Sequence, residues 1–169
     1  MSERLQGKIG IVTGAGSGIG RACAIALARE GARVALVGRR KDRVEEVARE
    51  IGDSAFAISA DVSDTSEISR LLDQTVTHFG GLSFLLNNAG VLHIGNAEQI
   101  TEAQWDHTFQ VNVRAVWLLS RAALPHLRKA GGGSSITRCS QRSTDRRPGT
   151  TPDHRPEYGV ALRHHAATA

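Results

Sequence analysis

Near its N-terminus the chain reads Thr13-Gly14-Ala15-Gly16-Ser17-Gly18-Ile19-Gly20, with four glycines in eight residues. Residues 8–13 form a short apolar run typical of a buried strand, and residues 19–29 carry apolar side chains at helical spacing. A turn this tight needs glycine where the backbone adopts unusual dihedral angles, and a missing side chain lets a pyrophosphate approach the amides of a helix N-terminus. The position of the loop between strand and helix therefore predicts dinucleotide binding rather than a turn with only a structural role.

The alternation of strand and helix continues along the chain, where three further strand-like runs are each followed by a helix-like segment. The runs cover residues 33–37, 55–58 and 82–86, and the helices cover 42–51, 64–79 and about 101–124. Asp64 with Glu67, and Thr101 with Gln104, have the spacing of helix capping boxes. We therefore predict a Rossmann-like α/β domain over residues 1–136, a doubly wound parallel sheet of four strands with their helices.

Four motifs occur in the order and spacing of one known family. Three residues separate Gly14 from Gly18, Asp61-Val62 follows the third strand, Asn87-Asn88-Ala89-Gly90 follows the fourth, and Asn112 lies inside the long helix. In this pattern the chain resembles the short-chain dehydrogenase/reductase family from residue 5 to about residue 136. The resemblance implies oxidoreductase activity on a carbonyl or alcohol with a nicotinamide cofactor, and it places Asn112 at an active-site position of the family.

Twelve residues are assigned to cofactor binding. Arg39 and Arg40 come from a basic turn after the second strand, and the others come from the motifs of the resemblance. The twelve are Gly14, Ser17, Gly18, Ile19, Gly20, Arg39, Arg40, Asp61, Val62, Asn88, Ala89 and Gly90. Two alternatives stay open, because Asp61 could simply form the turn at a strand end and Asn112 could be a helix residue bonded to nearby backbone. Cys23 fits core packing, and the scattered histidines lack the spacing of metal ligands, so no metal site is expected.

The end of the second strand bears on the choice of cofactor. An acidic side chain there would bind the ribose 2′-hydroxyl of NAD and repel a 2′-phosphate. This chain has Arg39-Arg40-Lys41 instead, with no acid before Asp42. Guanidinium groups suit a phosphate dianion, so the turn favours NADP(H) over NAD(H), the alternative being a merely solvated basic turn.

The catalytic set that the resemblance implies is incomplete. Family members use a serine on the fifth strand and a Tyr-x-x-x-Lys pair on the next helix, whose lysine lowers the pKa of the tyrosine. Tyr158, the only tyrosine, is followed four residues later by Leu162, and the serine position falls near Ser140 or Gln141. We therefore expect this chain to retain cofactor binding alone.

Residues 137–169, the basic tail, differ from the rest in composition. The formal net charge is +4, and six arginines against three acids in the tail account for most of it. The tail contains only two residues from the set Val, Ile, Leu, Met, Phe and Trp, so we expect it to be disordered. Its abrupt start suggests a truncated or frameshifted family member, with the fourth strand left as an exposed edge.

Two other readings remain open. The chain could be a non-catalytic nucleotide-binding or regulatory module whose basic tail meets an acidic partner, although nucleic-acid binding is not favoured. It could also associate with longer relatives through the fourth strand and the long helix, in a family that is usually homo-oligomeric. With two cysteines, no secretory signal and no apolar run near the roughly 18 residues that span a bilayer, a cytoplasmic location without membrane association is expected.

Overall fold

A computed structural model describes residues 4–138 and the backbone of residues 162–165. Its elements are β1 (Ile9–Thr13), α1 (Gly18–Arg29), β2 (Arg33–Gly38), α2 (Lys41–Ile51), β3 (Ala55–Ser59), α3 (Thr65–Phe79), β4 (Phe84–Asn87), α4 (Glu102–Phe109), the π-helical turn η1 (Gln110–Arg114), α5 (Ala115–Lys129), β5 (Ser134–Thr137) and β6 (Leu162–His165). Each predicted strand and helix of the first 130 residues is present, with ends that differ by a few residues.

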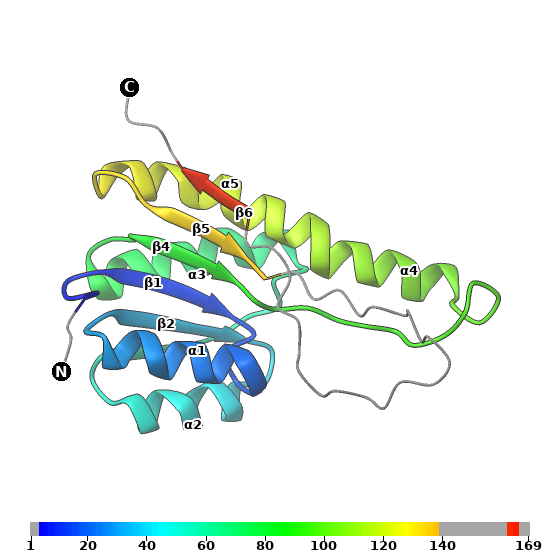
Figure 1. Cartoon of the computed structure of the whole chain (residues 1–169), viewed down its shortest axis with the longest axis horizontal. Coiled ribbons are helices and arrows are strands. Elements are labelled where there is room, and N and C mark those ends of the chain that lie inside the picture. Colours follow the sequence, from blue (N-terminus) through cyan, green and yellow to red (C-terminus); the bar gives the residue numbers. More distant parts are fainter. Residues whose placement is uncertain (1–3, 139–161, 166–169) are drawn as a thin grey trace, which may run out of the picture.

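The strands form one sheet in the order β3-β2-β1-β4-β5-β6, of which β2 to β6 can be followed in Figure 1. The first five strands are parallel, and β6 runs antiparallel to β5. The chain builds the sheet outward from β1 through β2 to β3, then crosses to the other side of β1 with β4. The predicted doubly wound, Rossmann-like architecture is confirmed, and its switch point lies between β1 and β4, where such sheets bind ligands.

Two apolar clusters cover the two faces of the sheet, because alternate side chains of a strand point to opposite faces. In β2, Val34 and Leu36 are in the cluster that includes Val44 and Val47 of α2, whereas Ala35 and Val37 are in the cluster with α3 and α5. All four β2 side chains are fully buried. A strand buried on both faces reads as an unbroken apolar run, as the sequence of β2 does.

The two predicted capping boxes have different outcomes. At α4 the box is confirmed, since Thr101 Oγ1 accepts from the Gln104 backbone and the Gln104 side chain accepts from the Thr101 backbone. At α3 the cap is Asp64 alone, which accepts from the Ser66 hydroxyl and backbone N–H. These bonds lower the pKa of Asp64. The predicted reciprocal bond is absent: the Asp64 backbone N–H donates to the Asp61 carbonyl, and Glu67 pairs with Arg70.

The prediction of four strands with β4 as an exposed edge was wrong. β5 pairs with β4, and β6 then covers β5. Three of the four residues of β5 are polar, but Ser135 is 6% exposed, and its hydroxyl bonds Asn87 Nδ2 at 3.4 Å and Ser120 Oγ at 3.0 Å. A strand can therefore be buried without apolar periodicity when its hydroxyls find partners, and these partners lie far away in sequence.

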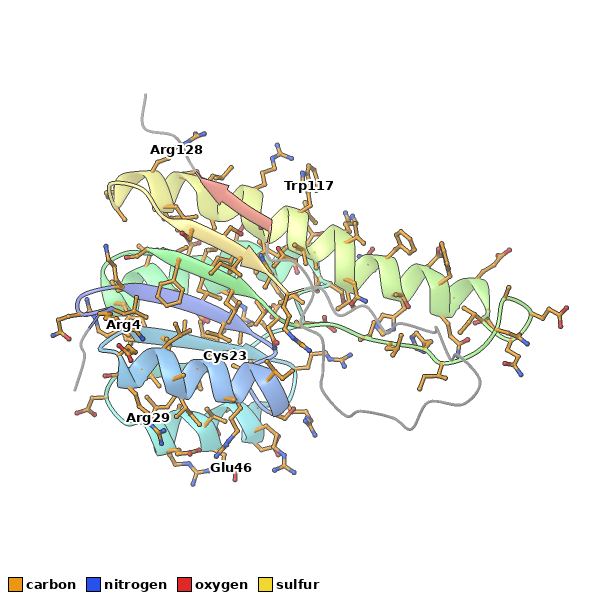
Figure 2. All side chains as sticks on the ribbon, in the orientation of Figure 1. Arg4, Cys23, Arg29, Glu46, Trp117 and Arg128 are labelled. Carbon is orange, nitrogen blue, oxygen red and sulfur yellow. The ribbon has the colours of Figure 1, made fainter. Side chains whose placement is uncertain are left out.

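Residues 162–165 of the predicted tail pair with β5 as β6, and most of the remaining tail lies outside the described residues, where the prediction of disorder is not tested. The long helix α4–η1–α5 packs one side on the sheet and on α3 through residues such as Leu119 and Leu127. Its other side exposes large apolar residues, and Trp117 projects away from the sheet (Figure 2). In the part of the chain that the structure describes, no helix has the length and apolarity needed to cross a bilayer.

Candidate dinucleotide-binding site

A cavity of about 760 Å³ lies at the carboxyl ends of the strands, over the switch point between β1 and β4. All twelve residues predicted to bind a cofactor line it: Gly14, Ser17, Gly18, Ile19, Gly20, Arg39, Arg40, Asp61, Val62, Asn88, Ala89 and Gly90. They come from the loops after β1, β2, β3 and β4. Because the strands are parallel, these four loops lie along the same edge of the sheet.

The glycines of the first loop have three different steric situations. Gly14 has a φ of +65°, and a Cβ there would lie 3.0 Å from Ala89 Cα. A Cβ on Gly20 would lie only 2.2 Å from the Gly14 carbonyl oxygen, so this position packs α1 against the loop. Gly18 has a φ of +55°, and nothing lies within 4 Å of a Cβ placed on it. Gly14 and Gly20 are therefore needed by the protein itself, whereas Gly18 leaves space on the cavity side.

The loops after β1 and β4 are joined by a clamp between Thr13 and Asn88. Thr13 Oγ1 accepts from the backbone N–H groups of Asn88 and Ala89, each at 2.9 Å. In return, Asn88 Nδ2 donates to the Thr13 carbonyl at 3.0 Å and to the Gly14 carbonyl at 3.4 Å. The Asn-Asn-Ala-Gly segment thus fixes the glycine loop across the switch point.

Replacing Thr13 by Val should destabilise the protein by about 2 kcal/mol, because it leaves two partly buried N–H groups without their acceptor. Val preserves the shape of the side chain, which is 2% exposed, so packing changes little. Urea unfolding measures the loss. Thr13→Ser keeps the hydroxyl and should cost less than about 1 kcal/mol, since only one methyl group is removed. Equal losses in the two variants would contradict the role given to the hydroxyl.

The electrostatics of the cavity favour an anion. Ser17 is the N-cap of α1, its side chain makes no capping bond, and the first turn has no acidic residue. The first amides of a helix have no intrahelical acceptor, and the helix dipole adds positive potential there. Arg39 and Arg40 line the same cavity, and within the described residues neither guanidinium takes part in an ion pair. Their neighbours Lys41 and Arg43, in contrast, pair with acids of α2.

The sequence model of the short chain dehydrogenase family matches residues 8–152, which is most of the chain. The chain belongs to the short-chain dehydrogenase family. The matched range extends beyond about residue 136, where the resemblance read from the sequence ended.

Individual members of the short-chain dehydrogenase family agree with this assignment. Versicolorin reductase of Emericella nidulans is 41% identical over 132 residues, which are 76% of this chain and 50% of that protein. D-threitol dehydrogenase of Mycolicibacterium smegmatis is 35% identical over 144 residues, covering 83% of this chain and 55% of the relative. The chain spans about half the length of the curated relatives that it matches.

A solved structure matches in fold as well as in sequence. The 3-ketoacyl-(acyl-carrier-protein) reductase of Brucella melitensis, crystallised with NADH, superimposes with a TM-score of 0.74 at 41% identity. The match covers 75% of this chain and 52% of the reductase. The two proteins therefore share a fold over the matched part of this chain.

Asp61 and Asn112, the two residues with open alternatives, both make local bonds. Asp61 Oδ1 accepts from the Ser63 backbone at 2.9 Å and hydroxyl at 2.7 Å, so Asp61 does form a turn while it also lines the cavity. Asn112, in η1, uses both ends of its amide on Val91, accepting from the backbone N–H at 2.9 Å and donating to the carbonyl at 2.8 Å. It therefore ties the loop after β4 to the long helix. Val91 lines the cavity, so Asn112 lies next to it, and the catalytic position that the short-chain dehydrogenase resemblance implies for Asn112 stays a prediction.

Sequence reasoning missed two cations of the cavity, Arg43 and Arg138. Arg43 lies in the first turn of α2, close in sequence to Arg39 and Arg40, and the basic run could have been extended to include it. Nothing in the sequence pointed to Arg138, because it depends on β5 pairing with β4. Ser140, Gln141 and Tyr158, considered for the catalytic positions, lie outside the described residues, as does Cys139.

Cys23 has a free thiol and is partly buried on α1 (Figure 2). Among the residues that the structure describes, no three His, Cys, Asp or Glu side chains are grouped so as to hold a metal ion. His93 and His107 form a pair with 3.2 Å between Nε2 and Nδ1, which joins the loop after β4 to α4. The groups available to bind a ligand in the cavity are the amides at the start of α1 and the arginine guanidinium groups, and these suit an anionic organic ligand.

Proposed function

We propose that this chain binds a nicotinamide dinucleotide in the cavity at the switch point, and NADP(H) in preference to NAD(H). The observation that carries the proposal is that twelve residues chosen from four separate loops line a single cavity. The glycine geometry supports it, since a pyrophosphate must approach the backbone closely at the second fingerprint glycine, Gly18, and nothing lies within 4 Å of a Cβ placed there. The Brucella reductase, crystallised with NADH, has the same fold at 41% identity.

The preference for NADP(H) is supported by the turn after β2. Arg39 and Arg40 line the cavity next to the strand end where a ribose 2′-substituent would lie, and no acid precedes Asp42. A 2′-phosphate dianion would form ion-paired, bidentate hydrogen bonds with these guanidinium groups, whereas a neutral 2′-hydroxyl offers a single acceptor oxygen and no charge. The distinction between the two cofactors therefore depends on these two side chains.

A bound nicotinamide supplies hydride transfer in dehydrogenases. This chain lacks the Tyr-x-x-x-Lys pair, because Tyr158 precedes Leu162 by four residues and the lysines are Lys8, Lys41 and Lys129. A phenol without a neighbouring cation titrates near pH 10 and is poorly matched to proton transfer at neutral pH. We therefore propose that this chain binds the cofactor without turnover. Its ancestral activity would be NADP(H)-dependent carbonyl reduction.

Calorimetric titration of the full chain with NADPH and NADH tests the proposal. Replacing Arg39 and Arg40 together by Gln should lower NADPH affinity about tenfold, because charge-assisted bonds to the 2′-phosphate are lost. NADH affinity should stay unchanged. Hydride transfer from NADPH to carbonyl compounds should be undetectable.

The matched control replaces Arg29 and Arg49 by Gln, since both lie in the last turns of α1 and α2 and neither lines the cavity. This control should leave both affinities unchanged. Equal losses in the two double variants would show that only overall charge matters. Binding of neither cofactor to the unaltered chain would refute the proposed function, and turnover abolished by mutation of Ser140 or Tyr158 would refute the loss of catalysis.

Three further proposals concern the location of the protein, its association with relatives and its basic tail. A cytoplasmic location is supported by the low cysteine content, which suits a reducing compartment. Association with longer relatives through β4 is wrong, because β4 is paired on both sides, but association through the exposed side of α4 and α5 stays a proposal. A regulatory role for the basic tail concerns residues mostly outside the described part of the chain. If that role exists, RNA binding should weaken with salt.

A further inference from the structure

Arg138 occupies a defined position on one side of the cavity. Its backbone N–H donates to the Asn87 carbonyl at 3.0 Å, which continues the pairing of β5 with β4. Its Nη1 donates to Asn88 Oδ1 at 3.3 Å. Because the amide nitrogen of Asn88 is held by Thr13 and Gly14, the oxygen that receives Arg138 is fixed in orientation. The guanidinium is thus held at the mouth of the cavity by a side chain that belongs to the clamp.

The order of the strands separates the charges of the cavity. Arg39 and Arg40 follow β2, and Asp61 follows β3, so all three lie on one side of the switch point. Arg138 follows β5 on the other side. Asp61 is the one acidic side chain that lines the cavity within the described residues, so no carboxylate on the β4–β5 side offsets Arg138.

The same order indicates which half of a dinucleotide Arg138 faces. The pyrophosphate belongs at the N-terminus of α1 and the adenosine ribose at the end of β2, as in doubly wound folds generally. A dinucleotide that crosses the switch point therefore directs its second nucleoside toward β4 and β5. In NADP(H) this second nucleoside carries the nicotinamide ring.

We propose that Arg138 makes the cavity discriminate between the two redox states of the cofactor, so that it binds NADPH more tightly than NADP⁺. This inference rests on the proposed function. The oxidised ring is a pyridinium cation and the reduced ring is neutral, while the rest of the molecule is the same. A fixed guanidinium on the nicotinamide side repels the oxidised ring alone, and its attraction for the phosphates cancels in the comparison.

The experiment is calorimetric titration of the full chain and of Arg138→Leu with NADPH and NADP⁺. We expect the ratio of the dissociation constant for NADP⁺ to that for NADPH to fall about fivefold in Arg138→Leu. This is the effect of removing the repulsion between two partly screened unit charges. Arg138→Lys retains the charge and should keep most of the ratio. Arg128→Leu, an exposed arginine on α5 away from the cavity (Figure 2), is the matched control and should leave the ratio unchanged.

A second measurement needs no variant. In the unaltered chain the ratio should shrink as salt rises from about 0.05 M to 1 M, because an exposed charge is screened over a few ångströms at high ionic strength. A 2′-phosphorylated ADP-ribose, which lacks the ring, provides the test of cavity binding by itself. If the ratio is unchanged in Arg138→Leu or does not depend on salt, the inference about Arg138 is overturned. In that case binding of NADPH, NADP⁺ and the ADP-ribose still upholds the proposed function. Failure of all three ligands to bind overturns both.

Discussion

Replacing Gly18 by Asp is expected to weaken NADPH binding about a hundredfold, because a carboxylate at the start of α1 would repel the pyrophosphate at close range. The position has a φ of +55° and no atom within 4 Å of a Cβ, so the protein has room for the new side chain. Asp adopts left-handed backbone conformations more readily than most residues, and a negative charge in the first helical turn is favourable. We therefore expect the fold to survive while binding is lost, as measured by calorimetric titration and urea unfolding.

Two controls separate charge from backbone strain in this experiment. Gly18→Asn has nearly the same size as Asp without its charge, so it should lose only the part of the affinity that depends on space. Gly80→Asp places the same residue at another left-handed glycine, with φ of +90° and open surroundings, at the end of α3 and away from the cavity. It should leave NADPH affinity unchanged. A hundredfold loss in Gly80→Asp, or none in Gly18→Asp, would contradict the placement of the pyrophosphate.

Replacing Gly20 by Ala is expected to destabilise the protein by about 3 kcal/mol, the cost of forcing a methyl group into a closed contact. A Cβ there would lie 2.2 Å from the Gly14 carbonyl oxygen and 2.4 Å from Asn88 Nδ2. Alanine is otherwise better than glycine inside a helix by about 0.5–1 kcal/mol. The clash outweighs this gain because one contact is with backbone and the other with the amide that clamps the loops.

The control for Gly20→Ala is Arg21→Ala, at the next and exposed position of α1. It removes an ion pair with Glu50 whose side chains are each 44% exposed, so we expect a change of at most about 1 kcal/mol. Urea unfolding compares the two variants. If Gly20→Ala is as stable as the unaltered chain, the close approach of α1 to the glycine loop is not a requirement of the fold.

Much of the cavity could be predicted from the sequence because of the way a parallel α/β sheet is built. Each strand ends in a loop at the same edge, so motifs such as Gly14–Gly20, Asp61-Val62 and Asn88–Gly90 are local in sequence and converge in space once the strands pair. Apolar runs give the strands, and 3.6-residue periodicity gives the helices. No long-range information is needed to recognise these parts.

The errors of the sequence reading have one physical source, which is bonding between residues distant in the chain. Ser135 is polar and breaks the apolar pattern, yet it is buried because Asn87 Nδ2 donates to its hydroxyl and Ser120 Oγ shares a second hydrogen bond with it. β6 adds a strand from a segment without apolar periodicity, through backbone pairing with β5. Arg138 enters the cavity only because β5 continues the sheet beyond β4.

The Rossmann-like class, the glycine loop and the basic turn after β2 can all be read from the amino-acid sequence, since each depends on residues close together in the chain. The clamp between Thr13 and Asn88, the bonds of Asn112 to Val91 and the extension of the sheet by β5 and β6 are visible only in the folded protein. The reason is that hydrogen bonds between separate elements leave no periodic trace in a sequence. They arise when the hydrophobic faces of strands and helices have already brought those elements into contact.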